Sequence, residues 1–259
     1  MGISITRQVF WRLEREARRA LRYAGYELVR GGANRISDQP AWVRDIIAQV
    51  QPFTITTPER ITALCNAVEY VSKCGIPGNI VECGVWRGGS MMAAALSLMH
   101  LGDTSRILML FDTFDGMTPP SDLDRDSNTR FSATELLAVS PRTSRYWAVS
   151  PIQEVRGNLA KTAYPTQNID LVKGPVEETI PGFAPDRIAI LRLDTDWHAS
   201  TKHELIHLYP RLASGGVLII DDYGDWEGAR KAVDDYIDEQ GLKVLLVRID
   251  RAARIAVKP

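Results

Sequence analysis

The sequence predicts an α/β fold: a mostly parallel sheet with helices on both faces and an antiparallel last strand. Short runs of valine, isoleucine and leucine alternate with amphipathic segments from residue 79 onward, as in parallel sheets covered on both faces. A glycine-rich turn follows the first run, and aspartates follow three later ones. We expect an N-terminal helical extension over residues 1–52 and one main domain over residues 53–259.

The composition indicates a globular chain with no nucleic-acid partner and no membrane span. The 259 residues suffice for one large domain, and the formal net charge of −1 provides no field that would attract nucleic acid or an anionic membrane. No apolar run approaches the roughly 20 residues that span a bilayer. The three cysteines, Cys65, Cys74 and Cys83, match no metal-ligand spacing. We therefore expect a reduced, cytoplasmic location.

The first thirty residues contain an amphipathic pattern. Apolar residues such as Phe10, Leu13 and Leu21 recur at helical spacing among arginines, and Glu14 and Glu16 argue against a transit peptide. We expect a helix that packs on the body or on a second subunit of a homodimer. A helix lying on a membrane surface is the alternative.

The remaining elements follow from periodicity and from turn residues. Asp38-Gln39-Pro40 ends the first helical region, and a helix begins after Thr57, with Pro58 at its first position, and stops near Gly75. The predicted strands are 79–83, 106–111, 169–172, 187–193, 217–220, 243–249 and 254–257, and the predicted helices between them are 90–101, 201–212 and 228–240. A capping-box pattern at Thr201 and Glu204 predicts the start of the helix 201–212. The last two strands form a hairpin.

Residues 115–151 interrupt this alternation. They include two consecutive prolines, Pro119 and Pro120, and three nearby aspartates, Asp122, Asp124 and Asp126. A long insertion without regular structure is usually a lid or binding loop. Because it follows the second strand, it would overhang the carboxyl edge of the sheet, so we expect a lid over the acceptor. A passive surface loop is the alternative.

The glycine-rich turn, Val81 to Ser90, joins the first strand to its helix. Gly84 allows a tight turn, and Gly88 and Gly89 would let a ligand approach main-chain N–H groups at a helix N-terminus. The glycine spacing differs from the dinucleotide fingerprint G-x-G-x-x-G. Such a turn is shared by many α/β folds and identifies no ligand by itself.

Asp112 ends the second strand, where an acid in doubly wound folds binds the ribose hydroxyls of a nucleoside. Capping of the following turn is the alternative role. Together with the glycine turn, Asp112 favours a cofactor that contains adenosine.

Aspartates also follow the fourth and fifth strands. Asp194 and Asp196 come after the fourth, and Asp221 and Asp222 after the fifth. These carboxylates would converge at one sheet edge, and their mutual repulsion requires protonation or a cation. Oxygen ligands suit Mg²⁺. The alternative is that a basic side chain neutralises them, the candidates being Arg192, Arg187 and Lys202.

A competing pattern lies in the helix 201–212. His203, Glu204 and His207 match H-E-x-x-H of zinc hydrolases, and His198 could be a third ligand. The helix is short, lies between two buried strands, and is followed by no further ligand at a known zinc spacing. We expect these histidines to be surface and packing residues.

Several motifs occur in an order that resembles one family. They are PGNIVECGVWRGGS (77–90), FDTFDG (111–116), VKG (172–174) followed by EET (177–179), LYP (208–210) leading to Gly215-Gly216, and TITTPER (54–60). Over about residues 53–257 the chain resembles the macrocin O-methyltransferase family.

The resemblance implies a class I methyltransferase (Rossmann-like) fold, S-adenosylmethionine, Mg²⁺, and transfer of methyl to a hydroxyl of a deoxysugar in a glycosylated natural product. It places metal ligation on Asp194, Asp221 and Asp222. The implied cofactor contacts are Thr57, Glu82, Gly84, Val85, Trp86, Arg87, Gly88, Gly89, Ser90, Asp112, Phe114, Val176 and Glu177. Asp194 is our candidate to receive the hydroxyl proton, with His198 and Asp196 as alternatives.

The chain departs from the family pattern at the acidic loop 122–126 and at Trp197-His198, and we expect both to face the acceptor. A catechol-type small-molecule O-methyltransferase is the alternative function. More distant alternatives are an NAD-dependent oxidoreductase, which would leave the aspartate cluster without a role, and a non-catalytic cofactor-binding protein.

Overall fold

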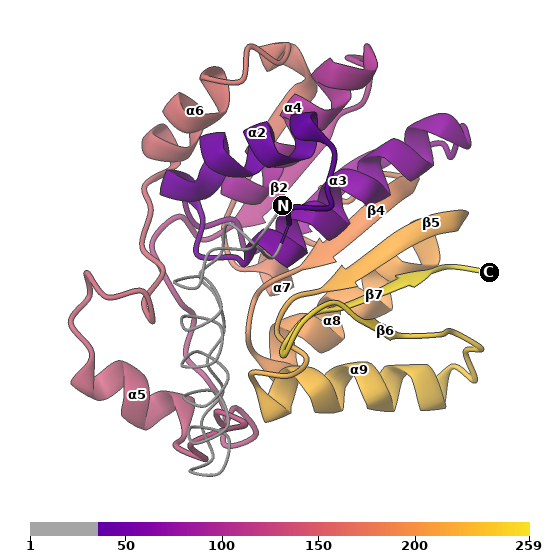
Figure 1. The fold of residues 1–259 in the computed structure, drawn as a ribbon. Helices are drawn as coiled ribbons and strands as arrows, with labels where there is room; N and C mark the ends of the chain where they lie inside the picture. The colour runs from indigo at the N-terminus through magenta and orange to yellow at the C-terminus, as the bar shows by residue number, and fades with distance from the viewer. Residues whose placement is uncertain (1–35) are drawn as a thin grey trace, which may run out of the picture. The chain divides into compact units, whose positions relative to one another are not determined.

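A computed structural model describes residues 36–259 (Figure 1). Residues Gln39–Pro259 form one compact unit. The predicted N-terminal amphipathic helix lies outside the described residues. The division of the chain at residue 52 stays a prediction.

The core of the compact unit is a seven-stranded sheet with the order β3-β2-β1-β4-β5-β7-β6. Pairing is parallel from β3 to β5, and β7 runs antiparallel to both β5 and β6. The strands are β1 Asn79–Cys83, β2 Leu108–Asp112, β3 Ile169–Lys173, β4 Ile188–Leu193, β5 Leu212–Ile220, β6 Val247–Arg248 and β7 Arg254–Val257. The predicted fold class, with its antiparallel last strand, is confirmed.

Helices cover both faces of the sheet (Figure 1). One face carries α2 Ala41–Val50, α3 Pro58–Lys73, α4 Gly89–Leu101 and α6 Ile152–Ala160, and the other carries α7 Val176–Thr179, α8 His198–Leu208 and α9 Glu227–Glu239. Short 3₁₀ turns are η2 Gln51–Phe53, η3 Thr166–Asn168 and η4 Tyr209–Arg211. No helix in the described part of the chain is long and apolar enough to cross a membrane.

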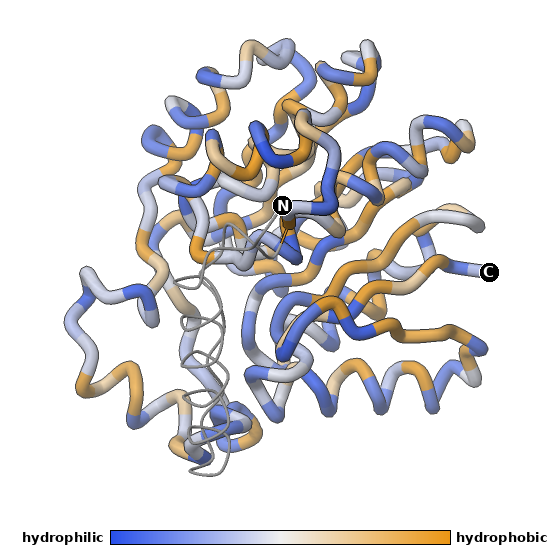
Figure 2. Tube along the Cα trace, viewed as in Figure 1, coloured by the Kyte–Doolittle hydropathy of each residue, from blue (hydrophilic) through white to orange (hydrophobic). Residues whose placement is uncertain are grey.

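The strands are apolar because the sheet is buried between these layers (Figure 2). Every residue of β4 is buried. Burying a leucine or isoleucine side chain stabilises the fold by about 1.5–3 kcal/mol. Helix α9 is amphipathic and packs Ala229, Val233 and Tyr236 inward. One residue of β4, Arg192, is charged and nevertheless buried, with 2% of its surface exposed.

Three predicted elements have wrong boundaries: the helix 201–212 and the strands 217–220 and 243–249, the last of which is reduced to β6 Val247–Arg248. Helix α8 begins at His198, so Thr201 lies inside the helix and the predicted capping box does not form. Trp197 occupies the N-cap position without a side-chain cap, and the cap comes instead from the insertion, where Asp124 Oδ1 accepts from the His198 N–H at 2.7 Å. Strand β5 begins at Leu212, where the sequence predicts the end of a helix.

The insertion 115–151 has more regular structure than the sequence predicts. It contains α5 Ala133–Val139, which begins with a capping box between Ser132 and Glu135. Leu137 of this helix belongs to a small apolar cluster with Trp197 and Trp226. The insertion therefore packs against the N-terminal ends of α8 and α9 through a small apolar cluster.

Asp124 fixes the insertion to the body of the protein. It is fully buried, and its Oδ2 accepts from the Ser121 N–H and hydroxyl at 2.7 Å each. With the bond from His198 N–H to Oδ1, both oxygens have partners. Because a buried carboxylate is stable only when its hydrogen bonds are satisfied, Asp124 is a structural residue that joins the insertion to the start of α8.

We expect Asp124→Ala to lower the free energy of unfolding by about 2–4 kcal/mol, since it removes three charge-assisted hydrogen bonds. Urea unfolding measures this, and hydrogen exchange should accelerate across residues 115–139. Asp122→Ala is the matched control, because Asp122 is exposed two residues away. Equal stability of the two variants would contradict the anchoring role.

Candidate active site

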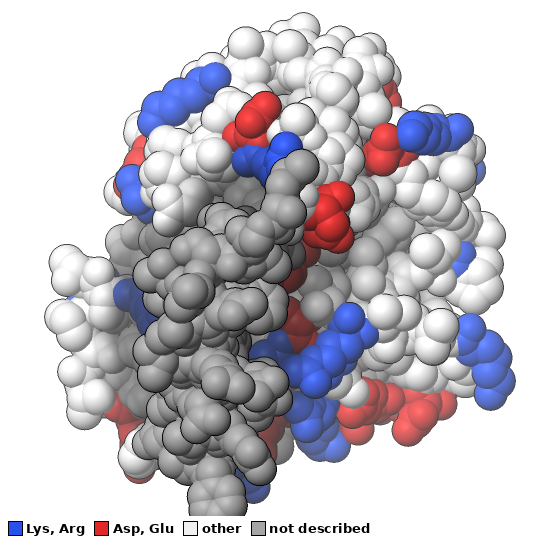
Figure 3. Space-filling model, viewed as in Figure 1, with Lys and Arg blue, Asp and Glu red and all other residues white. Residues whose placement is uncertain are grey.

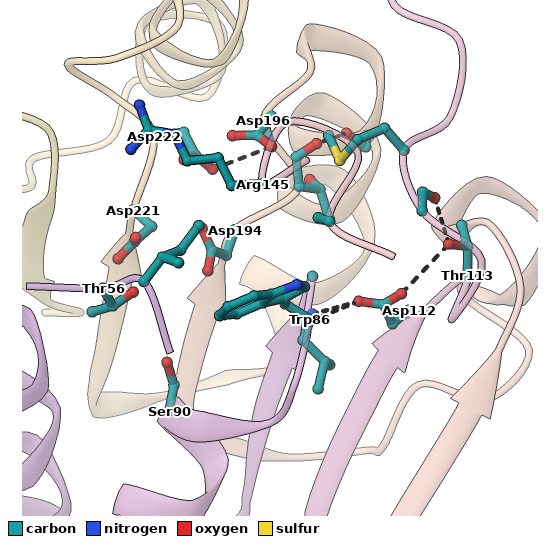
Figure 4. Close-up of a pocket in the computed structure, with 18 of the residues that line it drawn as sticks. Thr56, Trp86, Ser90, Asp112, Thr113, Arg145, Asp194, Asp196, Asp221 and Asp222 are labelled. Carbon is teal, nitrogen blue, oxygen red and sulfur yellow. Dashed lines mark hydrogen bonds between the residues drawn. The ribbon is translucent and has the colours of Figure 1, made fainter. Parts of the chain in front are cut away.

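A pocket of about 410 Å³ opens at the carboxyl ends of β1, β2, β4 and β5 (Figure 4). Gly84, Asp112, Asp194 and Asp221 come directly after these strands or end them, and all four line the pocket. This is the edge at which open α/β sheets bind ligands.

Gly84 and Gly88 give the β1–α4 turn its shape. Gly84 has φ +80°, and a Cβ there would overlap the carbonyl oxygen of Asp194. This close approach packs the turn directly against the end of β4. Gly88, at φ +87°, is the N-cap of α4, and a Cβ there would face Val155 of α6. Gly88 is thus required for the backbone conformation of the turn, and its Cβ position faces α6 outside the pocket.

Asp112 connects two turns. Its Oδ2 accepts from the N–H of Val85 at 2.6 Å and of Trp86 at 3.1 Å, and its Oδ1 accepts from the N–H of Phe114 at 2.6 Å. Burial raises the pKa of Asp112, and these three hydrogen bonds oppose that shift. Asp112 therefore caps its own turn and also lines the pocket, so its two predicted roles are compatible.

Trp86 projects into the middle of the pocket. Its indole lies between Asp112 on one side and Asp194 on the other (Figure 4). Trp86 adopts φ +45°, and Phe114 and Asp196 adopt φ +53° and +67°. Such conformations cost of order 1–3 kcal/mol each and concentrate at functional sites. Their clustering here supports a functional role for this edge.

Three carboxylates meet on the other side of the indole. Ligand oxygens of Asp194, Asp221 and Asp222 lie within 4.8 Å of one another, and this is the one group of such ligands found among the described residues. Asp196 adjoins them, and its N–H donates to Asp222 Oδ2 at 3.1 Å. The predicted convergence of these aspartates is therefore present in the fold.

Two arginines contact this cluster. Arg192 Nη1 donates to Asp194 Oδ2 at 2.6 Å, and Arg192 Nη2 lies 2.9 Å from Asp221 Oδ1 in an ion pair without hydrogen-bond alignment. Arg60 Nη1, from α3, donates to Asp221 Oδ2 at 2.6 Å. Of the three basic residues that the sequence suggested as neutralising groups, Arg192 occupies that position, and Lys202 pairs instead with Glu239.

Burial and mutual repulsion favour the protonated form of these carboxyl groups in spite of the two arginines. Burial raises the pKa of Asp222, with Asp196 and Asp221 adding to the shift, and burial raises the pKa of Asp196 to about 7. Burial also raises the pKa of Asp194, which Arg192 opposes and Asp221 reinforces. In Figure 3, acidic side chains line a hollow on this face and basic side chains adjoin them. The carboxyl groups of Asp194, Asp196, Asp221 and Asp222 outnumber the two guanidinium groups.

The pocket includes most of the residues suggested by the sequence. Those that line it are Thr57, Gly84, Val85, Trp86, Gly89, Ser90, Asp112, Val176, Glu177, Asp194, Asp221 and Asp222. Glu82, Arg87, Gly88 and Phe114 do not line it. Glu82 pairs with Arg192 inside the sheet, and Arg87 pairs with Glu154 at 2.6 Å. Of the two alternative proton acceptors, Asp196 lines the pocket and His198 does not.

The insertion forms the opposite wall. Its lining residues are Gly116, Met117, Thr118, Asp126, Arg145, Tyr146 and Ala148. The expectation that Trp197 and His198 face the acceptor is wrong, because Trp197 is buried and its Nε1–H donates to the Thr118 carbonyl at 2.9 Å. Both residues hold the insertion in place. Within the acidic loop, Asp126 lines the pocket.

The H-E-x-x-H pattern on α8 forms no metal site among the described residues. Glu204 is fully buried, and the His203 ring lies 2.9 Å from the Ile180 carbonyl. The His203 and His207 rings pack against each other with centroids 4.4 Å apart. These are packing residues, as the sequence analysis expected.

Sequence reasoning did not identify Arg60 and Asp250 as members of the site. A signal existed for Arg192 and Glu82, because each is the one charged residue inside an otherwise apolar or neutral strand run. No comparable signal marked Arg60, which reaches Asp221 from a helix 161 positions away in sequence.

A family model of the macrocin O-methyltransferases (TylF) matches residues 36–256. The chain is 34% identical over 201 residues to a Streptomyces olivaceus protein, 8-demethyl-8-(2,3-dimethoxy-alpha-L-rhamnosyl)-tetracenomycin-C 4'-O-methyltransferase, covering 76% of this chain and 72% of that one. It is 31% identical over 199 residues to mycinamicin III 3''-O-methyltransferase of Micromonospora griseorubida, covering 76% and 75%. Among solved structures, the O-methyltransferase NovP matches with a TM-score of 0.69 at 29% identity, covering 80% and 82%.

We expect Asp112→Asn to lower the free energy of unfolding by about 1.5–3 kcal/mol, because one carboxylate oxygen becomes an amide that cannot accept from the N–H groups it faces. Urea unfolding checks this. Asp115→Asn, three residues on and exposed, is the control and should stay within about 0.5 kcal/mol of the parent. An unchanged Asp112→Asn protein would show that Asp112 does not hold the two turns together.

Proposed function

The chain belongs to the macrocin O-methyltransferase family and is an O-methyltransferase, and we propose that it uses S-adenosylmethionine and Mg²⁺ to methylate a sugar hydroxyl of a glycosylated natural product. The observation that supports this most is that residues suited to a nucleoside cofactor and residues suited to a metal ion line the same pocket. A glycine turn with Asp112 lies on one side of Trp86, and the Asp194, Asp221 and Asp222 carboxylates lie on the other.

The glycine turn and Asp112 fit a sulfonium nucleoside. Gly89 and Ser90, at the N-terminus of the 13-residue helix α4, line the pocket, and the start of a helix would stabilise a carboxylate there. Asp112 has carboxylate lone pairs that could accept from ribose hydroxyls. Ser90, in the first turn of α4, directs its hydroxyl into the pocket (Figure 4).

The aspartate cluster fits a hard divalent cation. All three side chains offer oxygen ligands, and Asp221 and Asp222 are almost fully buried. A Mg²⁺ bound there would orient the acceptor and lower the pKa of its hydroxyl. Asp194 would accept the hydroxyl proton, because as a ligand of the metal it would lie beside the reacting oxygen.

The acceptor would lie between the cluster and the insertion. The name of the Streptomyces olivaceus relative specifies a rhamnosyl group and a 4'-O position. In this chain, Tyr146 and Arg145 from the insertion and Trp226 from the N-cap of α9 line that side of the pocket. Aromatic faces and charged hydrogen-bond donors suit a sugar ring. The insertion would therefore both bind the acceptor and exclude water.

Two further expectations remain proposals. We place the protein in the cytoplasm, because all three cysteines are free thiols, and we expect a homodimer. Light scattering on the purified protein measures the oligomeric state.

The cofactor role predicts that Ser90→Ala raises the dissociation constant of S-adenosylhomocysteine about 2- to 10-fold, the value of one neutral hydrogen bond. Calorimetry with S-adenosylhomocysteine measures this, and NADH should not bind. Ser97→Ala is the matched control, because Ser97 lies on the same helix and its hydroxyl donates to the Ala93 carbonyl at 2.7 Å. Binding of NADH with no binding of S-adenosylhomocysteine would refute the cofactor assignment.

The metal role predicts that exhaustive chelation by EDTA stops methyl transfer and that Mg²⁺ restores it. Asp222→Asn should lower kcat by orders of magnitude and leave the affinity for S-adenosylhomocysteine within about twofold, because the nucleoside residues lie across Trp86. Asp235→Asn is the control, since Asp235 lies on α9, pairs with Lys231 and does not line the pocket. Full turnover without divalent ions would exclude the metal.

A further inference from the structure

Arg192 and Glu82 form a charged pair in the middle of the sheet. They are register partners on the neighbouring strands β4 and β1, with 2% and 1% of their surfaces exposed. Arg192 Nη1 donates to Glu82 Oε1 at 2.6 Å. Replacing a buried ion pair by well-packed apolar residues is often neutral or stabilising, so stability alone does not account for this pair.

The guanidinium extends beyond Glu82 to the carboxylates of the pocket. The same Nη1 donates to Asp194 Oδ2 at 2.6 Å, and Nη2 contacts Asp221 Oδ1 at 2.9 Å and the Thr56 hydroxyl at 3.3 Å. A guanidinium is planar and rigid. Its two nitrogens therefore fix the separation of Asp194, at the end of β4, from Asp221, at the end of β5.

Asp221 is held from its other side as well. Arg60 Nη1 donates to Asp221 Oδ2 at 2.6 Å, and Arg60 Nε donates to Asp250 Oδ2 at 2.7 Å. Asp250 in turn accepts from the N–H of Ala252 and of Ala253 at 2.9 and 2.8 Å. Both oxygens of Asp221 thus face an arginine whose own position is fixed by another carboxylate.

We propose that Arg192 is a positioning residue that sets the spacing of Asp194 and Asp221, keeps the cluster assembled without metal, and weakens the affinity of the site for divalent cations. Glu82 is its anchor within the sheet. The inference rests on the proposed metal role. A fixed positive charge beside the ligands repels a divalent ion. Arg192 therefore positions Asp194 and Asp221 and at the same time lowers the affinity of the site for the metal.

The test uses Mn²⁺ as the probe, with free Mn²⁺ measured by electron paramagnetic resonance, alongside kcat and S-adenosylhomocysteine affinity. The double variant Arg192→Gln/Glu82→Gln removes both charges and keeps hydrogen-bonding side chains. It should bind Mn²⁺ at least about fivefold more tightly, because the guanidinium that contacts the ligand carboxylates directly is gone, whereas the negative charge lost at Glu82 lies on the far side of that guanidinium. The value of kcat should fall at least about tenfold, because the spacing is lost.

Arg192→Lys separates charge from geometry. It keeps the positive charge, so Mn²⁺ affinity should stay within about threefold of the parent, but one ammonium cannot replace the planar fork, so kcat should fall at least about tenfold. Arg106→Lys is the matched control, because Arg106 is a comparably enclosed arginine, 11% exposed, that bonds the Gly78 and Val71 carbonyls at the opposite end of the sheet. It should change neither quantity.

These measurements distinguish a role of Arg192 in positioning Asp194 and Asp221 from a role in stabilising the fold alone. Unchanged or weaker Mn²⁺ binding in a folded double variant, or parental kcat in Arg192→Lys, would overturn the inference. Absence of Mn²⁺ binding in the parent protein would overturn the proposed metal role together with this inference. If the double variant does not fold, Arg192→Lys alone decides, with S-adenosylhomocysteine affinity as the measure of folding.

Discussion

The balance of charge at the carboxyl edge of the sheet constrains the rest of this structure. Asp194, Asp221 and Asp222 lie close enough to repel one another, and two arginines reach them from different directions. Arg192 enters through the sheet itself. A buried guanidinium is stable only if its hydrogen bonds are satisfied, and the strand order that brings β1, β4 and β5 together supplies Glu82, Asp194 and Asp221 for that purpose.

The same requirement joins peripheral elements to the pocket. Arg60 connects α3 to Asp221, and through Asp250 it also connects to the turn between β6 and β7. Asp124 performs a similar task for the insertion, because its buried carboxylate needs the His198 N–H at the start of α8. Carboxylates buried at turns thus hold three separate segments around one cavity. A change in any of these contacts would alter the geometry of the site.

The sequence predicted the sheet and the convergence of the aspartates because both follow from local rules. Apolar strand runs specify a buried parallel sheet, and the carboxyl ends of parallel strands share one edge. It failed at the start of α8, where the cap comes from Asp124, 74 positions away. It failed for Trp197 and His198 for the same reason, since their partners lie in the insertion. Local patterns carry no information about such distant partners.

Sequence alone determined the fold class, the family resemblance and the residue types at the strand ends, because periodicity and turn chemistry are encoded within short windows of the chain. The tertiary structure decided which charges meet. Only the register of β1 against β4 shows that Glu82 supports Arg192, and only the packing of α3 shows that Arg60 reaches Asp221. Buried electrostatics depends on distances between segments remote in sequence, and those distances exist only once the chain has folded.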